Sequence, residues 1–201
     1  MPLQDSCLMQ HPILTLTLAL AAAVSAPASW AEKADRFKPL NVEADALRYD
    51  DLRQTSVFTG KVVATKGTIV LRAGRVEVRQ DAEGYQHAIA TAAPGERAFW
   101  RQKREGLDEY IEGEGETIEY DGRADRVRFV SRAELRRYRG QTLADETSGS
   151  VITYDNTTEQ FAGDGGAAGA RPANPGGRVR ATLSPRAEPQ PAAGQAPAVP
   201  Q

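Results

Sequence analysis

The chain has few of the residues that cross-link small folds or carry out catalysis. Its 201 residues include one cysteine and two histidines, and only His87 lies beyond the first 31 residues. Cys7 precedes an apolar segment that we interpret as part of a signal peptide, so we expect the mature chain to contain no cysteine. Disulfides and cysteine-based metal sites are therefore excluded, and the fold must depend on burial alone.

Long apolar runs are also missing. Residues 13–24 are almost wholly apolar, but these 12 residues are well short of the roughly 20 that span a bilayer. Small residues follow at Ser29 and Ala31, where a signal peptidase would read them, although the start of the chain has no Lys or Arg. We interpret residues 1–31 as a cleaved secretory signal peptide, so the protein is expected to be exported across the inner membrane.

Neither a strong net charge nor a catalytic motif is present. The chain has 25 basic and 27 acidic side chains and a net charge of −2, which argues against a nucleic-acid-binding protein. No phosphate-binding loop, nucleophile elbow or metal-ligand spacing occurs, and His87 stands in a polar, turn-like context typical of a surface histidine. We therefore expect no metal, no cofactor and no enzymatic activity, so any transport must be driven by a partner.

Proline is almost absent from the middle of the chain. Pro94 is the single proline between Leu40 and Gly163, whereas residues 163–201 contain 7 of the chain's 12. This change in composition predicts an ordered domain over residues 32–163 and a Pro/Ala/Gly-rich tail that is disordered at residues 186–201. Residues 178–185 still alternate and could form one final strand.

A short motif occurs three times: a hydrophobic residue, any residue, Tyr-Asp, and then a Phe. The copies are Leu47/Tyr49/Asp50 with Phe58, Ile118/Tyr120/Asp121 with Phe129, and Ile152/Tyr154/Asp155 with Phe161. The Tyr-to-Phe spacing is 9, 9 and 7 (58−49, 129−120 and 161−154), which predicts strand–turn–strand units with a shorter third copy. A repeated unit of this kind predicts a fold built by stacking.

The apolar residues of the ordered region have a period of two in many short runs separated by turn residues. This pattern predicts an all-β antiparallel fold in which one face of the sheet is buried and the other is exposed to solvent. The sheet could be arranged as a sandwich, a barrel or an open solenoid-like stack. One competing signal is residues 131–138, which have a capping-box start and good helix formers. We favour a strand there, because the segment occupies the same place after Phe129 as the strand-like residues 61–65 occupy after Phe58.

Charges of opposite sign are concentrated in two neighbouring segments. Residues 105–121 contain eight acids and no base, and residues 123–139 contain seven arginines. Glu112, Glu114 and Glu116 would line one face of a strand, and a pair such as Glu112 and Glu114 could be catalytic in an exported carbohydrate-active enzyme. A cross-strand charge ladder on the wet face is the simpler interpretation. The arginines could also bind an anionic head group.

The apolar stripe predicts either a core or a groove. Many short strands in an open stack need not close their two faces on each other, and the remaining trough could hold a fatty-acyl chain, since each buried methylene contributes roughly 0.8 kcal/mol. The alternative is a structural adaptor with a dry, packed interior. The candidate groove residues are Leu40, Val42, Leu47, Tyr49, Phe58, Val62, Ile69, Leu71, Phe99, Ile118, Tyr120, Phe129, Ile152 and Tyr154.

An open stack also has two end strands with unpaired backbone groups, which are either guarded or used for strand addition to a partner. The candidate edge residues are Leu40, Asn41, Val42 and Glu43 at one end, and Val179, Ala181 and Leu183 at the other.

Several segments together resemble the OstA-like domain family of lipopolysaccharide transport proteins. The resemblance rests on residues 40–45 (LNVEAD), 57–62 (VFTGKV), 66–69 (KGTI), 118–120 (IEY) and 151–154 (VITY), and it covers residues 40–163. It implies a periplasmic, antiparallel β-jelly-roll whose interior carries the acyl chains of lipopolysaccharide. It also implies edge-strand pairing with LptC at the inner membrane and LptD at the outer membrane, and head-to-tail self-association. The insert at residues 164–177 and the long tail depart from the family pattern.

Overall fold

The computed structural model describes residues 35, 37–104, 106–170 and 174–185; the predicted signal peptide and disordered tail lie outside them. The described part is all-β and antiparallel, as predicted, and no helix in it is long and apolar enough to cross a membrane. The strands are β1 (Asn41–Glu43), β2 (Ala46–Asp50), β3 (Thr55–Lys66), β4 (Ile69–Gln80), β5 (Gln86–Thr91), β6 (Ala98–Lys103), β7 (Glu109–Gly115), β8 (Thr117–Asp121), β9 (Arg126–Arg139), β10 (Thr142–Asp155), β11 (Gln160–Asp164) and β12 (Arg180–Leu183).

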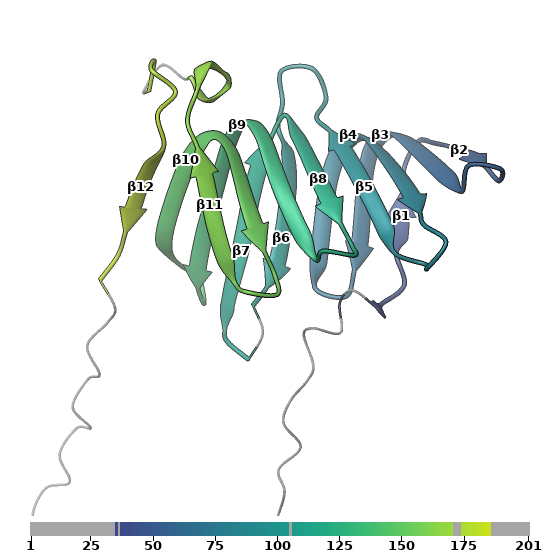
Figure 1. Ribbon diagram of the computed structural model, residues 1–201, viewed down its shortest axis with the longest axis horizontal. Coiled ribbons are helices and arrows are strands. Elements are labelled where there is room, and N and C mark those ends of the chain that lie inside the picture. Colours follow the sequence, from purple (N-terminus) through teal and green to yellow (C-terminus); the bar gives the residue numbers. More distant parts are fainter. Residues whose placement is uncertain (1–34, 36, 105, 171–173, 186–201) are drawn as a thin grey trace, which may run out of the picture.

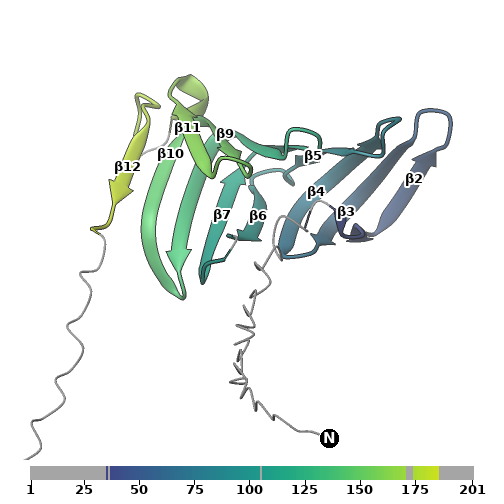
Figure 2. The same ribbon diagram turned by 60° about the horizontal axis from the view of Figure 1, so that its bottom comes forward.

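The strands stack along the long axis of the molecule, from β1 and β2 at one end to β11 and β12 at the other (Figure 1). The long strands β3, β4, β9 and β10 each take part in two layers. The first layer, called here the upper sheet, has the order β2-β3-β4-β5-β8-β9-β10-β11. The second layer, the lower sheet, has the order β1-β3-β4-β6-β7-β9-β10-β12 (Figure 2). This is a jelly-roll made by folding one continuous sheet over on itself.

The fold-over is produced by local bends in the long strands, which together form a spine along one side of the molecule. In β3 the pairing register shifts between Thr59 and Val62, where Gly60 and Lys61 have φ values of +81° and +45°. In β9 the bend falls at Ser131 and Arg132, with φ values of +59° and +52°. Bulges of this kind bend a strand and increase its twist, so each long strand passes from one sheet to the other at the spine.

The bend in β3 depends on a glycine, and this gives a testable prediction. A Cβ at Gly60 would lie 2.2 Å from Oδ2 of Asp45, whereas Gly95, at φ +83°, has nothing within 4 Å of its Cβ position. Gly95→Ala should lose about 1 kcal/mol of unfolding free energy from left-handed backbone strain alone. Gly60→Ala should lose about 1–3 kcal/mol more from overpacking. Urea unfolding of both variants measures the two losses. Equal losses would contradict the prediction that the close approach of Asp45 adds to the loss at Gly60.

The three Tyr-Asp motifs form equivalent turns at the side of the upper sheet opposite the spine. In each, the aspartate Oδ1 accepts backbone N–H groups two or three residues later: Arg53 for Asp50, Arg123 and Ala124 for Asp121, and Thr157 and Thr158 for Asp155. Each turn ends in a left-handed residue five positions after the tyrosine: Gln54, Asp125 or Glu159. The predicted strand–turn–strand unit is confirmed in all three copies.

The prediction of a shorter third copy is wrong. The tyrosine pairs with the residue seven positions later in every copy: Tyr49 with Ser56, Tyr120 with Val127, and Tyr154 with Phe161. The turns therefore have one length. Phe161 stands opposite the tyrosine, and Gly163 takes the place that Phe58 and Phe129 occupy in the other copies.

Candidate functional site

The two sheets approach each other again at the side opposite the spine, called here the mouth. Hydrogen-bond, aromatic and ionic contacts cross it. Lys66 at the end of β3 donates to Oε1 of Gln86 at the start of β5, at 2.8 Å, and the rings of Trp100 and Tyr120 lie 5.5 Å apart. Farther toward the C-terminal end, Arg104 of the lower sheet pairs with Glu159 of the upper sheet. The mouth is thus bridged over its central and C-terminal parts.

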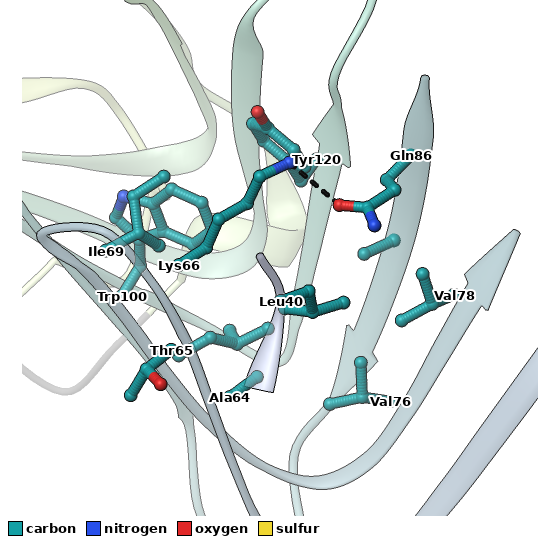
Figure 3. Close-up of a pocket in the computed structure, with 12 residues that line it drawn as sticks. Leu40, Ala64, Thr65, Lys66, Ile69, Val76, Val78, Gln86, Trp100 and Tyr120 are labelled. Atoms are coloured by element: carbon teal, nitrogen blue, oxygen red, sulfur yellow. Dashed lines mark hydrogen bonds between the residues drawn. The ribbon is translucent and has the colours of Figure 1, made fainter. Parts of the chain in front are cut away.

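An apolar cavity lies between the sheets at the N-terminal end of the stack (Figure 3). The apolar inner part, of about 30 Å³, adjoins a wider outer part of about 270 Å³ that is lined by both polar and apolar side chains, and Leu40, Val78 and Gln86 line both. The outer part, at about 270 Å³, is just below the volume range of ligand-binding pockets, which begins at about 300 Å³. The inner part is lined by Leu40, Ala64, Thr65, Lys66, Ile69, Leu71, Val76, Val78, Gln86, Ala88, Trp100 and Tyr120.

The cavity is open because the terminal strands of the two sheets are short. β1 has three residues and β2 has five. Leu47 pairs with Phe58 and so shares the inner face, yet its side chain is 61% exposed, and Tyr49 is 54% exposed. Apolar side chains that face inward without cover form the entrance of the cavity.

The predicted groove residues fall into two groups in the structure. Leu40, Val42, Tyr49, Phe58, Ile69, Leu71 and Tyr120 line the cavity, with Leu47 at its entrance. Val62 is almost fully buried beside the bend in β3. Ile118, Phe129 and Ile152 are almost fully buried farther along the stack, and Tyr154 is buried beside Arg104 and Phe161. The apolar stripe thus forms a cavity at one end and a packed core beyond it, where the sequence suggested one continuous trough.

Phe99 does not face the interior. It pairs with Arg72, whose guanidinium lies 5.4 Å from the Phe99 ring, and Arg72 is exposed on the outer face. Its neighbour Trp100 pairs with Leu71, is 2% exposed and lines the cavity. Because side chains alternate along a strand, the sequence prediction was off by one residue in β6.

Several polar residues that line the cavity were not predicted from the sequence, among them Lys66 and Gln86. Lys66 and Gln86 are each hydrophilic, so neither was assigned to the inner stripe. For Lys66 the sequence signal was its spacing: it follows the inward-facing residues Val62 and Ala64 in steps of two, and it is 6% exposed in the structure.

The predicted edge residues lie on the terminal strands of the lower sheet. β1 pairs with β3 along residues 41–43. β12 pairs with β10, and Val179 precedes it. The residues of β12 are all exposed, including Leu183. Within the described residues, neither strand has a second strand on its other side.

The acidic and basic segments pair across the outer face, as the charge-ladder interpretation predicts. Glu112 stands opposite Arg136 in the β7–β9 register and contacts Arg101 at 3.2 Å. Glu114 pairs with Arg97 and Arg136. The helix alternative for residues 131–138 is wrong, because these residues lie within β9. The carboxylates of Glu112 and Glu114 are therefore ion-paired with arginines, as in a charge ladder.

Glu134 is the buried centre of this network. Burial by itself would raise its pKa, but hydrogen bonds with Glu146 and Arg97 and the charge of Arg136 outweigh burial and lower the pKa to about 2. Arg97 Nη1 lies 2.8 Å from Glu134 Oε2. Since the folded pKa is below the ordinary glutamate value of 4.5, Glu134 stabilises the fold above pH 4.5, and this stabilisation is lost as the pH falls toward 2.

Glu134→Gln should therefore lower the unfolding free energy by about 1–3 kcal/mol at pH 7, since it weakens hydrogen bonds to charged partners. The loss should shrink between pH 4.5 and pH 3. Glu119→Gln is the matched control, because the Glu119–Arg128 pair is exposed and such pairs contribute about 0–1 kcal/mol. Chemical denaturation at several pH values measures both, and a pH-independent loss for Glu134→Gln would contradict the assignment.

His87 lies on the outer face between two aspartates. Its ring nitrogens are 3.5 Å from Asp81 and 3.4 Å from Asp121. It lines an open depression of about 520 Å³ together with Glu77, Arg79, Asp81 and Ile89. Among the described residues, no three side chains are grouped as metal ligands.

A folded-over antiparallel sheet with an apolar inner face and a cavity at one end of the stack defines a jelly-roll. The chain belongs to the LptA/(LptD N-terminal domain) LPS transport protein family, whose model matches residues 41–160.

Individual relatives agree with this assignment. The lipopolysaccharide export system protein LptH of Pseudomonas aeruginosa is 29% identical over 177 residues, which cover 88% of this chain and 97% of the relative. The lipopolysaccharide export system protein LptA of Haemophilus influenzae is 28% identical over 158 residues, covering 79% and 87%. The crystal structure of LptH, described as the LptA-homologous periplasmic component of the lipopolysaccharide transport device of P. aeruginosa, superposes with a TM-score of 0.64 at 26% identity, covering 76% of this chain and 99% of LptH.

Proposed function

We propose that this protein is a periplasmic, non-enzymatic carrier of lipopolysaccharide that shields acyl chains between its two sheets. The observation that carries the proposal is the cavity at the N-terminal end, whose apolar inner part is lined by Leu40 and Val78 and lies against a largely apolar core. Membership of a lipopolysaccharide transport family supports the same substrate. Residues 1–31 would direct export and be removed.

The bridged mouth defines how the carrier works. Acyl chains would enter at the open N-terminal end, where the inner face is least covered. To move farther along the stack they must displace side chains that are now packed, such as Ile118 and Phe129. Passage therefore requires the sheets to separate at the mouth while the spine holds them together. The driving energy comes from a partner, because the family role is transport and no nucleotide-binding motif is present in the sequence.

The end strands supply the proposed route between membranes. β1 at the N-terminal end and β12 at the C-terminal end would each add to a sheet of a neighbouring domain. In this proposal one end pairs with LptC at the inner membrane and the other with LptD at the outer membrane, with further copies of the chain joined head to tail between them. The exposed inner-face residues at the entrance would then be covered by the neighbouring jelly-roll, which would continue the groove.

The experiment that tests the proposed function is chemical analysis of the purified protein. The mature chain is isolated from the periplasm without detergent, extracted with organic solvent and examined by mass spectrometry. We expect glycolipid with the mass of lipid A species. A structural adaptor with a dry interior, the alternative function, would carry no glycolipid, and that result would contradict the carrier.

A further inference from the structure

An ion pair crosses the mouth near its C-terminal end. Arg104 follows β6 in the lower sheet, and its Nη2 lies 2.5 Å from Oε2 of Glu159, in the turn between β10 and β11 of the upper sheet. The same guanidinium pairs through Nη1 with Glu109, in its own β6–β7 hairpin. The Arg104 side chain is 13% exposed, so salt screens these pairs less than it screens exposed ones. One arginine thus holds its own hairpin with one arm and the opposite sheet with the other.

The position of Glu159 is used differently in each of the three repeats. Every Tyr-Asp turn ends in a left-handed residue, which is Gln54, Asp125 or Glu159. The Gln54 side chain bonds within its own turn, and Asp125 accepts from Asn156 in the next turn of the same sheet. The Glu159 carboxylate instead reaches the opposite sheet. Glutamate is not among the residues enriched in left-handed backbone, and strain of this kind is concentrated at functional sites and switch regions.

A small cavity lies behind the ion pair, between the sheets at the C-terminal end of the stack. It measures about 40 Å³, and its wall includes Ile111 and Leu135 of the lower sheet and Phe161 of the upper sheet. Arg104 and Glu159 line it as well, so the pair forms part of its wall on the side of the mouth. The interior therefore has space at both ends, and the C-terminal space is bridged by an ionic contact.

We propose that the Arg104–Glu159 pair is a latch, which holds the C-terminal end of the mouth closed and must break before a bound amphiphile moves past it. This inference rests on the proposed function and adds to it a gate at one end of the interior. An amphiphile with its acyl chain between the sheets and its head group in water occupies the mouth itself. It therefore cannot pass a contact that bridges the mouth.

The second carboxylate makes the latch releasable. When the sheets separate, Glu159 moves into water with the upper sheet, and Glu109 stays beside Arg104 in the lower sheet. The buried guanidinium then keeps a counter-ion, which avoids the large cost of leaving a buried charge unpaired. An arginine paired with Glu159 alone would be much harder to open.

The test measures the width of the mouth and the release of lipid in the same variants of the mature protein. Nitroxide labels on Leu107→Cys and Thr157→Cys, at exposed positions close to Arg104 and Glu159, report the distance between the sheets by double electron–electron resonance. In Glu159→Gln we expect a longer distance to become populated. We also expect bound lipopolysaccharide to dissociate about tenfold faster, the usual effect of losing a charged hydrogen bond.

Two further variants separate the latch from a purely structural role. Glycine adopts the left-handed backbone of position 159 without strain, so Glu159→Gly keeps the turn and should still widen the mouth and speed release. Glu109→Gln removes the other carboxylate of Arg104, which does not cross the mouth. It should leave the short distance unchanged and should not speed release.

Each other outcome contradicts the latch in a distinct way. Unchanged distances in both Glu159 variants would show that the pair does not hold the mouth closed. A wider mouth with an unchanged dissociation rate would show that lipid does not pass this point. Equal effects of Glu159→Gln and Glu109→Gln would assign the network a structural role. If the unmodified protein binds no lipopolysaccharide, the proposed function fails together with the latch; if it binds and only the effects of the Glu159 variants are missing, the carrier stands and the latch alone fails.

Discussion

Phe129→Ala should destabilise the protein by about 3–5 kcal/mol, the largest effect expected of a single truncation in this chain. The Phe129 side chain is fully buried at the centre of the stack. Its ring fills the space beside Gly113, where a Cβ would lie 2.2 Å from the ring, so it joins β9 to β7 across the interior. Urea unfolding measures the loss.

The other copies of the repeat provide the control for this prediction. Phe161, in the third copy, is 46% exposed, and Phe161→Ala should lose less than about 1 kcal/mol. Gly113→Ala should lose about 1–3 kcal/mol by overpacking against Phe129, and much of that loss should disappear in a Phe129→Leu background. Similar losses for Phe129→Ala and Phe161→Ala would show that the centre of the stack is not the main packed core.

Phe58→Asp should weaken lipid binding at least about 100-fold while the protein stays folded. Phe58 is partly buried at the outer part of the cavity, so a carboxylate there can reach water in the unbound protein. A bound acyl chain would cover that carboxylate and would also lose the contact with the ring, and both effects oppose binding. Affinity for purified lipopolysaccharide, measured by displacement of a fluorescent fatty acid, gives the result.

Phe99→Asp is the matched control for Phe58→Asp, because Phe99 lies on the outer face beside Arg72. We expect Phe99→Asp to bind lipopolysaccharide as the unmodified protein does. Equal losses from the two substitutions would contradict the placement of the site between the sheets. Ile118→Asp, which the sequence alone suggests as an equivalent test, is unsuitable: Ile118 is almost fully buried, so a carboxylate there should unfold the chain.

Most of the fold could be predicted from the sequence because its signals are local. The period of two gave the antiparallel strands, and the Tyr-Asp motif marked three turns whose aspartates accept backbone N–H groups. The opposite charges of residues 105–121 and 123–139 predicted their cross-strand pairing. The assignment of Phe99 to the interior failed because Trp100 is also apolar, and a one-residue change of phase reverses every side chain of a strand.

The site was less predictable because it depends on where the two sheets separate. Leu47 and Ile118 occupy equivalent positions in their repeats, yet one is exposed at the entrance and the other is buried in the core. That difference arises from the short terminal strands β1 and β2, which leave the inner face uncovered. The inward direction of Lys66 follows from its alternation with Ala64, but its pairing with Gln86 across the mouth required the tertiary structure.

The central claim is that the interior of the jelly-roll, and not its outer surface, receives lipopolysaccharide. The most direct measurement is crosslinking in living cells with a photoreactive phenylalanine at Leu40, inside the cavity, or at Ile89, an exposed apolar residue on the outer face of β5. The account predicts a lipopolysaccharide adduct from position 40 and none from position 89. Adducts from position 89 alone, or equally from both, would contradict it.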